Sequence, residues 1–159
     1  MQRDRNQSCA ITVADSESNA HRAGVAFRPM VERDIDAAVR LISRAMNANE
    51  GNQAQDTLRF HFSCRRHGID DGRRYYILTQ DSAIDGIAGL HHYVWGPPEN
   101  VWLAWFAVEP GFHGQGLGTL LLDATACKAT FLGYKKLFIE TYSTPEFARA
   151  RDFYRAKGF

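Results

Sequence analysis

The feature that most constrains the fold is a strand-like run followed at once by a glycine-rich turn and a helix-like stretch. Residues 101–108 are almost wholly apolar, which is typical of a central strand buried on both faces. Three glycines follow within residues 114–118, and leucines and alanines then recur at helical spacing up to Gly133, which predicts a helix over 116–132. Glycines allow a sharp turn, and a helix start offers unpaired N–H groups with a partial positive charge. This unit therefore predicts a phosphate-binding loop.

The residue sequence of this turn excludes two common phosphate-binding loops. A Walker loop requires a lysine directly after its last glycine, and no lysine follows these glycines. A dinucleotide-binding Gly-x-Gly-x-x-Gly motif counted from Gly114 ends on Thr119, and counted from Gly116 it ends on Leu121. The loop is therefore neither of a nucleotide triphosphatase nor of a dinucleotide-binding fold.

The remaining periodicity predicts a mixed α/β domain with the order β-α-α-β-β-β-α-β-α. Strands are expected at 25–28, 75–79, 84–95, 101–108 and 137–141, and helices at 35–45, 54–66, 116–132 and from Pro145 onwards. Asp34 is expected to cap the first helix, and residues 47–52 to form a loop. Residues 1–23 are polar and aperiodic, so we expect a flexible tail ahead of a single domain over 24–159.

Bulk composition narrows the function classes. With 159 residues, 45% of them hydrophobic and 23% charged, the chain is expected to form one globular domain. A net charge of +1 gives no electrostatic case for nucleic acid or membrane binding, and no signal peptide or bilayer-length apolar run is present in this sequence. Cys9, Cys64 and Cys127 lack metal-ligand spacing. We therefore expect reduced thiols, no metal and a cytoplasmic location, with Cys127 on the core side of its helix.

Two segments resemble motifs of the GCN5-related N-acetyltransferase (GNAT) superfamily. Residues 113–118, His-Gly-Gln-Gly-Leu-Gly, follow Val-Glu-Pro and are similar to the acyl-CoA motif Arg/Gln-x-x-Gly-x-Gly/Ala. Residues 150–159 resemble the Ala-x-x-x-Tyr-x-x-x-Gly-Phe segment of the last helix of the family. The sequence departs from the family pattern at His113, and at Phe147, where the family often has asparagine.

The resemblance implies acetyl-CoA as co-substrate, with its pyrophosphate on backbone amides of the turn. It also implies a bulge in strand 101–108, where free N–H groups hold the pantetheine arm and polarise the acetyl carbonyl. The expected coenzyme-binding residues are Phe106, Ala107, Val108, His113, Gly114, Gln115, Gly116, Leu117, Gly118 and Thr119. Arg149 or Arg151 is a further candidate for the 3′-phosphate. The family fold continues past Gly-Phe with two more strands, so we expect a domain short at its C-terminus that forms a homodimer or packs loosely there.

The catalytic expectations concern an acid and a base. Tyr154 matches the family tyrosine that donates a proton to the departing sulfur, a role suited to a phenol with a pKa of about 10. Some relatives have a glutamate near the start of the central strand that acts as the general base, and Trp102 stands at that position here. The expected base or acceptor-binding carboxylate is Glu140, and His91, His92 or a water relay are the alternatives. Adjacent strand residues face opposite ways, so only one of the two histidines can face the cleft.

The aromatic residues Tyr93, Trp95, Trp102 and Trp105 are expected either to wall the acceptor pocket or to serve packing. The resemblance thus predicts an N-acetyltransferase that transfers acetyl from acetyl-CoA to a primary amine, of a small molecule or a peptide, by direct attack. The alternatives are an acyl-CoA-binding regulatory module without turnover and an inactive fragment of an acetyltransferase.

Overall fold

The computed structural model describes residues 24–159, and the predicted flexible tail over 1–23 lies outside them. Its strands are β1 (Val25–Pro29), β2 (Arg73–Gln80), β3 (Ala83–His91), β4 (Asn100–Val108) and β5 (Lys136–Phe138), its helices are α2 (Ile35–Ala45), α3 (Ala48–Arg66), α4 (Leu117–Phe131) and α5 (Ala148–Ala156), and its short 3-10 turns are η1 (Glu32–Asp34), η2 (Pro110–Phe112) and η3 (Pro145–Phe147). This order confirms the predicted mixed α/β fold. No helix within residues 24–159 is both long and apolar enough to cross a membrane.

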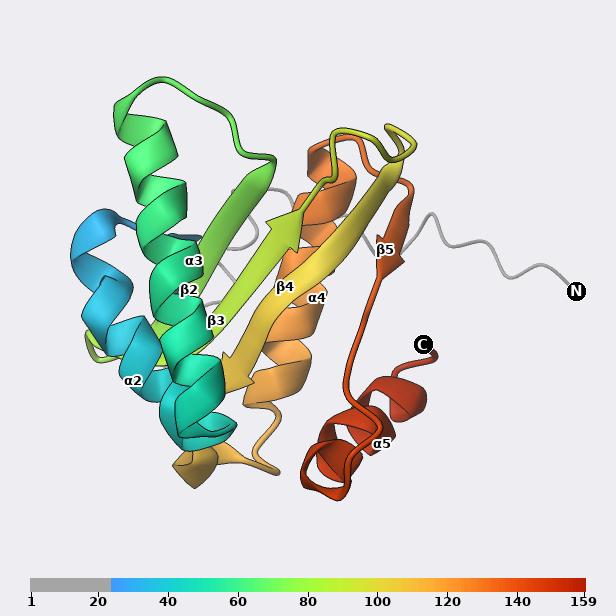
Figure 1. Cartoon of the computed structure of the whole chain (residues 1–159). Helices are drawn as coiled ribbons and strands as arrows, with labels where there is room; N and C mark the ends of the chain where they lie inside the picture. Colours follow the sequence, from blue (N-terminus) through green and yellow to red (C-terminus); the bar gives the residue numbers. More distant parts are fainter. Residues whose placement is uncertain (1–23) are drawn as a thin grey trace, which may run out of the picture.

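The sheet has the strand order β1-β2-β3-β4-β5, with β5 parallel to β4 and the other neighbours antiparallel. Helices α2 and α3 cover one face and α4 covers the other (Figure 1). Leu41, Ile42 and Leu58 of the first pair pack with Ile77 and Ile87 of the sheet. On the opposite face, α4 packs its buried leucines against the other side chains of the same strands. Burial of these alternating side chains stabilises the three-layer core.

Helix α3 begins earlier than predicted. The expected loop over 47–52 is wrong, because Asn47 is the N-cap of α3 and its side-chain oxygen accepts a hydrogen bond from the Glu50 N–H at 2.9 Å. The first two turns of α3 are mostly polar, so apolar periodicity did not reveal them. A capping interaction satisfies N–H groups that the helix itself cannot, which explains why a polar segment is helical here.

Asp34 does not cap α2 as predicted. Its carboxylate accepts hydrogen bonds from the Val31 N–H at 2.9 Å and from the Arg28 guanidinium at 2.8 and 3.1 Å. Burial acts to raise the pKa of Asp34, but these hydrogen bonds and the charge of Arg28 outweigh it, so the pKa lies below its usual value. Asp34 therefore ties β1 to the turn that precedes α2.

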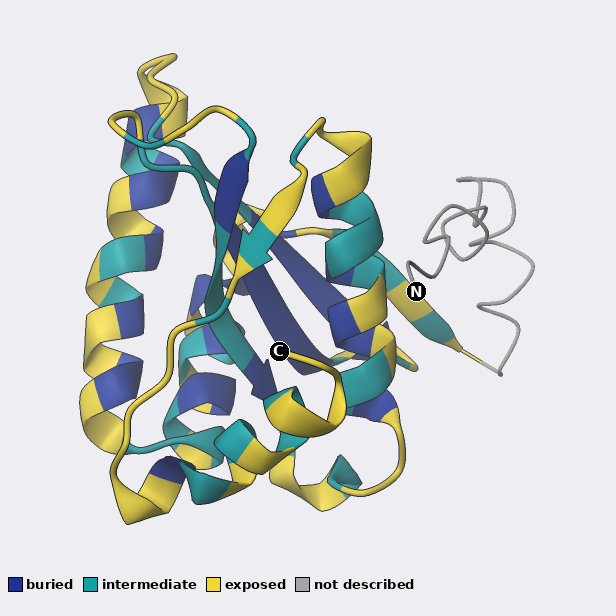
Figure 2. Cartoon of the chain, turned by 90° about the vertical axis from the view of Figure 1, so that its right-hand side faces the viewer, coloured by how far each residue is buried: buried dark blue, intermediate teal, exposed yellow. Residues whose placement is uncertain are grey.

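Two strands are shorter than predicted. Strand β3 ends at His91 instead of residue 95, because the chain then turns and the Gly96 N–H donates to the Tyr93 carbonyl at 2.8 Å. Strand β5 ends at Phe138 instead of residue 141. The segment that follows β5 is largely exposed (Figure 2), so nothing there continues the ladder.

Strand β4 is interrupted by a bulge at Trp105, whose backbone has a left-handed φ of 42°. Its pairing with β3 changes from Gly89–Ala104 to Ile87–Ala107 across this point. The outer edge of β4 pairs with β5 only over residues 100–102. The prediction that the whole strand is buried on both faces is therefore wrong for residues 102–106, which are half-buried. The bulge and the short β5 leave backbone groups in the second half of β4 free for another partner.

Candidate active site

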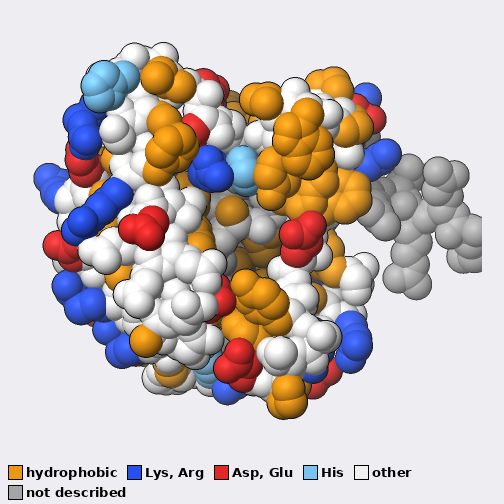
Figure 3. Space-filling model, in the orientation of Figure 1, with side chains coloured by type: hydrophobic (Ala, Val, Ile, Leu, Met, Phe, Trp, Pro, Cys, Tyr) orange, Lys and Arg blue, Asp and Glu red, His pale blue; other side chains and the backbone are white. Residues whose placement is uncertain are grey.

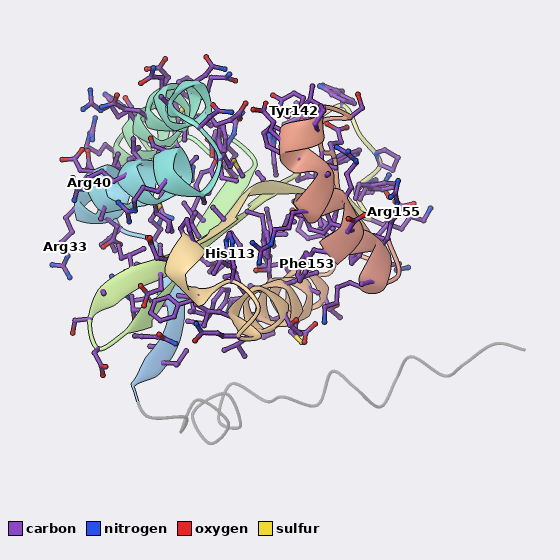
Figure 4. All side chains as sticks on the ribbon, turned by 90° about the horizontal axis from the view of Figure 1, so that it is seen from below. Arg33, Arg40, His113, Tyr142, Phe153 and Arg155 are labelled. Carbon is purple, nitrogen blue, oxygen red and sulfur yellow. The ribbon has the colours of Figure 1, made fainter. Side chains whose placement is uncertain are left out.

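A cavity of about 450 Å³ lies beside the second half of β4. Its walls come from the end of α2, the turn after β4, the start of α4, and α5 with the preceding η3, and its lining residues are Ala45, Met46, Phe106, Ala107, Val108, Phe112, His113, Gly114, Gly116, Gly118, Thr119, Glu146, Phe147, Arg149, Ala150, Phe153 and Tyr154. Figure 4 shows the labelled side chains of His113 and Phe153 close together between α2 and α5, while Arg155 points away. The two segments singled out in the sequence therefore meet at one cavity.

The glycine turn has the backbone that a phosphate cradle requires. Gly114 and Gly116 have left-handed φ values of 80° and 84°, and a side chain added at either would project into open space. Gly116 is the N-cap of α4, and no side chain of the described residues caps this helix. The first N–H groups of α4 are therefore available to an anion, and the helix dipole favours negative charge at the same place.

His113 stabilises the turn from within. Its Nε2 atom lies 3.1 Å from the Val108 carbonyl oxygen, and because a carbonyl can only accept, Nε2 must carry the proton. The imidazole therefore ties the turn back to the end of β4. This contact gives a structural reason for a histidine at the position where the family motif has arginine or glutamine.

Most of the predicted coenzyme-binding residues come together at the cavity, and two do not line it. Phe106, Ala107, Val108, His113, Gly114, Gly116, Gly118 and Thr119 all do so. Gln115 is exposed and its side-chain amide donates to the Gly111 carbonyl at 3.0 Å. Leu117 is buried in the core beneath α4. The side chains of these two residues therefore serve the turn and the core.

Tyr154 lines the cavity from α5. Its ring lies 5.9 Å from that of Phe106 and 5.4 Å from that of Phe153, measured between centroids. Burial raises the pKa of Tyr154 well above its usual value. The hydroxyl is therefore protonated at neutral pH, as a proton donor must be.

The predicted base candidates lie elsewhere. Glu140 is exposed in the segment after β5 and is not among the residues that line the cavity. The His92 Nδ1 donates to the Asn100 carbonyl at 3.0 Å, and its ring packs beside Tyr134. His91 contacts Tyr93 on the face that α2 and α3 cover, and burial and the charge of Arg73 lower its pKa to about 4. His91 is therefore neutral at pH 7 and a weak base.

The four aromatic residues separate into two places. Tyr93 stacks on Trp95 with ring centroids 4.7 Å apart and meets Trp102 edge-on at 5.0 Å, while Trp102 stacks on Phe138 at 4.9 Å. Trp95 is 77% exposed. Trp105 instead packs against the core beneath α2 and α3. The first three therefore form a partly exposed aromatic wall near the start of β4.

Sequence reasoning missed Glu50 and two cavity walls. Glu50 is a buried acidic residue in the first turn of α3. The cavity also uses Met46 at the end of α2 and Phe147 of η3. The Asn47-x-x-Glu50 spacing is a capping-box pattern that would have placed the helix start correctly. Of the two arginines considered for the 3′-phosphate, Arg149 lines the cavity, whereas Arg151 donates to main-chain carbonyls of the segment before η3.

Comparisons with known proteins agree with this geometry. The family profile described as "Acetyltransferase (GNAT) domain" matches residues 71–159. An amino-acid acetyltransferase of Mannheimia succiniciproducens is 34% identical over 84 residues, which are 52% of this chain but only 18% of that protein's length.

Two solved structures share the fold. A structure assigned to the GNAT family from Desulfovibrio desulfuricans has 25% identity and a TM-score of 0.74, with 84% of this chain and 83% of that chain covered. An acetyltransferase from Clostridium acetobutylicum, solved with acetyl-CoA, has 16% identity and a TM-score of 0.63, with 85% and 89% covered. The fold, the cavity and the family match together define the class: this chain belongs to the GNAT acetyltransferase family.

Residues 24–159 contain no group of three or more His, Cys, Asp or Glu side chains placed to hold a metal ion.

Proposed function

We propose that this protein is an N-acetyltransferase that moves the acetyl group of acetyl-CoA onto a primary amine by direct attack. The observation that carries the proposal is one cavity shared by the glycine turn, the bulged half of β4 and Tyr154. These are the three parts that the reaction needs: an anion site for the coenzyme, a free strand edge for its arm, and a proton donor for the leaving group.

The coenzyme's diphosphate would lie on N–H groups of residues 113–116 and of the first turn of α4. The amides of its pantetheine arm would hydrogen-bond to the unpaired edge of β4 between Phe106 and Val108. Arg149 stands at the cavity wall where a 3′-phosphate can be reached. A structural neighbour was solved with acetyl-CoA, which supports acetyl-CoA as the co-substrate.

Tyr154 would protonate the coenzyme thiolate as the C–S bond breaks. Its raised pKa keeps the hydroxyl in the donor form throughout the physiological range. Neither Cys64 nor Cys127 lines the cavity, which favours direct attack over a covalent cysteine intermediate. Glu140 as base stays a prediction, and its exposed position means that it would have to act through water or through an acceptor that extends to it.

The proposal is tested by incubating the full chain with acetyl-CoA and a panel of primary amines while thiol release is measured. The panel includes amino acids, because the amino-acid acetyltransferase relative names that acceptor class, together with polyamines, aminoglycosides and peptide N-termini. Thiol release that depends on the amine, with an acetylated product of the expected mass, supports the proposal. Tight acetyl-CoA binding without release for any acceptor would favour a regulatory acyl-CoA-binding module instead.

We also propose a homodimer, on the ground that β5 is a short strand at the edge of the sheet with Phe138 partly exposed. Sedimentation velocity at two protein concentrations tests this, and a monomer at both would contradict it. The cytoplasmic location stays a prediction of the sequence.

A further inference from the structure

Glu50 is a buried carboxylate with no cationic partner among residues 24–159. The residue is 6% exposed, and no ion pair within that range includes it. It stands in the first turn of α3, where Asn47 caps its backbone N–H. The helix dipole stabilises an acidic side chain there, but burial without a counter-ion is still costly. Glu50 is therefore a candidate to bind a cation that comes from outside the chain.

The neighbour of Glu50 on the segment after β5 is Tyr142. The negative charge of Glu50, together with burial and a hydrogen bond to Glu50, raises the pKa of Tyr142. The Tyr142 ring in turn packs against that of Phe147, with centroids 4.9 Å apart. Tyr142, on the segment after β5, therefore lies close to the carboxylate on the first turn of α3.

Residues next to this pair line the cavity, although Glu50 and Tyr142 are not themselves among its lining residues. Met46, four residues before Glu50, and Phe147, which packs on Tyr142, both line the cavity. Figure 3 shows the molecule hollowed between the part formed by α2 and α3 and the part formed by β5 and α5, with hydrophobic, acidic, basic and histidine side chains around the edge of the hollow. The cavity wall itself carries the charged residues Glu146 and Arg149, and Arg44, next to the lining residue Ala45, forms an ion pair with Glu109.

We propose that Glu50 receives the ammonium group of the acceptor and takes a proton from it. This assignment rests on the proposed function and names Glu50, instead of Glu140, as its base. The ammonium nitrogen gives one proton to a Glu50 carboxylate oxygen, and the neutral amine attacks the carbonyl carbon of the thioester. When the tetrahedral intermediate collapses, the C–S bond breaks, the sulfur takes the Tyr154 proton, and the nitrogen releases its second proton to water. Tyr154 then regains a proton from water and Glu50 gives its proton to water, so that both return to their starting forms. The net products are the N-acetyl amine, free coenzyme thiol and one proton.

The assignment also narrows the acceptor class. A buried carboxylate attracts a cation, and aliphatic amines are cations at pH 7 because their pKa values lie at about 8 to 10. Weakly basic aromatic amines are neutral at this pH and gain nothing from Glu50. We therefore expect alkylammonium acceptors, including amino acids and polyamines, to be used in preference to aromatic amines of similar size.

The test compares the carboxylate variants E50Q and E140Q with wild type on the best acceptor of the panel. We expect E50Q to lower kcat/KM by about 100-fold or more at pH 7, with the acetyl-CoA dissociation constant unchanged by calorimetry. Without the carboxylate, E50Q can use only amine that is already neutral in solution. The rate of this variant is therefore expected to rise about tenfold per pH unit up to the pKa of the acceptor. D56N, an exposed carboxylate on the same helix, is the matched control and should behave as wild type.

Two further variants separate chemistry from folding. E50D keeps the charge one methylene further back and should recover part of the lost activity, and Y142F should lower activity less than E50Q. Activity of E50Q within threefold of wild type with the wild-type pH profile, or loss in E140Q alone, would overturn the assignment. If wild type binds acetyl-CoA but acetylates no amine, the proposed function fails; the ammonium site is then judged by calorimetry of an alkylamine with the CoA complex, where E50Q must weaken binding for the assignment to stand.

Discussion

At the scale of single residues, the site depends on two side chains whose surroundings fix their proton state. Burial keeps the Tyr154 hydroxyl protonated, and the contact with the Val108 carbonyl requires His113 to carry its proton on Nε2. Neither effect was visible in the sequence, where Tyr154 was identified only by its place in a motif. What the sequence did reveal was the residue type, because no other neutral side chain offers a phenolic donor at that position.

Tyr154→Phe tests the donor role. Removing the hydroxyl leaves the ring contacts with Phe106 and Phe153 in place, so we expect kcat to fall by about 100-fold while the acetyl-CoA dissociation constant stays nearly the same. Because the pKa of Tyr154 is raised, wild-type activity should show no loss from tyrosine ionisation up to about pH 10. Steady-state kinetics across pH check both statements, and unchanged turnover in the variant would remove the role.

Gly116→Ala tests the cradle. A non-glycine residue at this left-handed φ costs about 1–2 kcal/mol, and here the strain falls on the amides proposed to bind phosphate, so acetyl-CoA affinity should drop. Gly133→Ala is the matched control, because Gly133 has a φ of 92° and open space around it at the far end of α4. Both variants should lose similar stability in urea unfolding, and only the first should lose affinity in calorimetry. Equal affinities would contradict the placement of the pyrophosphate.

At the scale of elements, periodicity predicted the existence of each helix and strand, and local contacts decided their ends. The continuous run of aromatic and apolar residues in β2 and the helical spacing of the leucines in α4 made those elements predictable from the sequence. The polar start of α3 was hidden because its stability comes from the Asn47 cap. The length of β5 was overestimated because the chain beyond Phe138 no longer pairs with β4. The stretch after β5 leads into η3, whose Glu146 and Phe147 line the cavity, so this error falls next to the site.

Asp34 provides a pH test at this scale. Its folded-state pKa is lowered below the value of about 3.9 expected in the unfolded chain. Its contribution to stability is therefore fully present above about pH 4 and is lost as the pH falls through the folded-state pKa. Urea unfolding should show that Asp34→Asn is less stable than wild type at pH 7 and that the difference shrinks at pH 3. A stability difference that is the same at pH 3 and pH 7 would contradict the stabilising role of the ionised Asp34 carboxylate.

At the scale of the whole molecule, two motifs far apart in sequence converge because β5 and its exposed connection carry α5 across to the glycine turn (Figures 1 and 4). The sequence order of elements was sufficient to predict this convergence through the family resemblance. It was not sufficient to find Glu50, because a burial that depends on the approach of α3 to the segment around Tyr142 is a property of tertiary packing. The proposed acceptor residue could therefore be found only from the structure.

The most direct test of the account is a calorimetric titration of the full chain with acetyl-CoA. The account predicts saturable binding at one site per chain, competed by free CoA and weakened in Gly116→Ala but not in Gly133→Ala. If no binding is detected at millimolar acetyl-CoA with folded protein, the glycine turn does not hold the coenzyme, and the proposed acetyl transfer is contradicted with it.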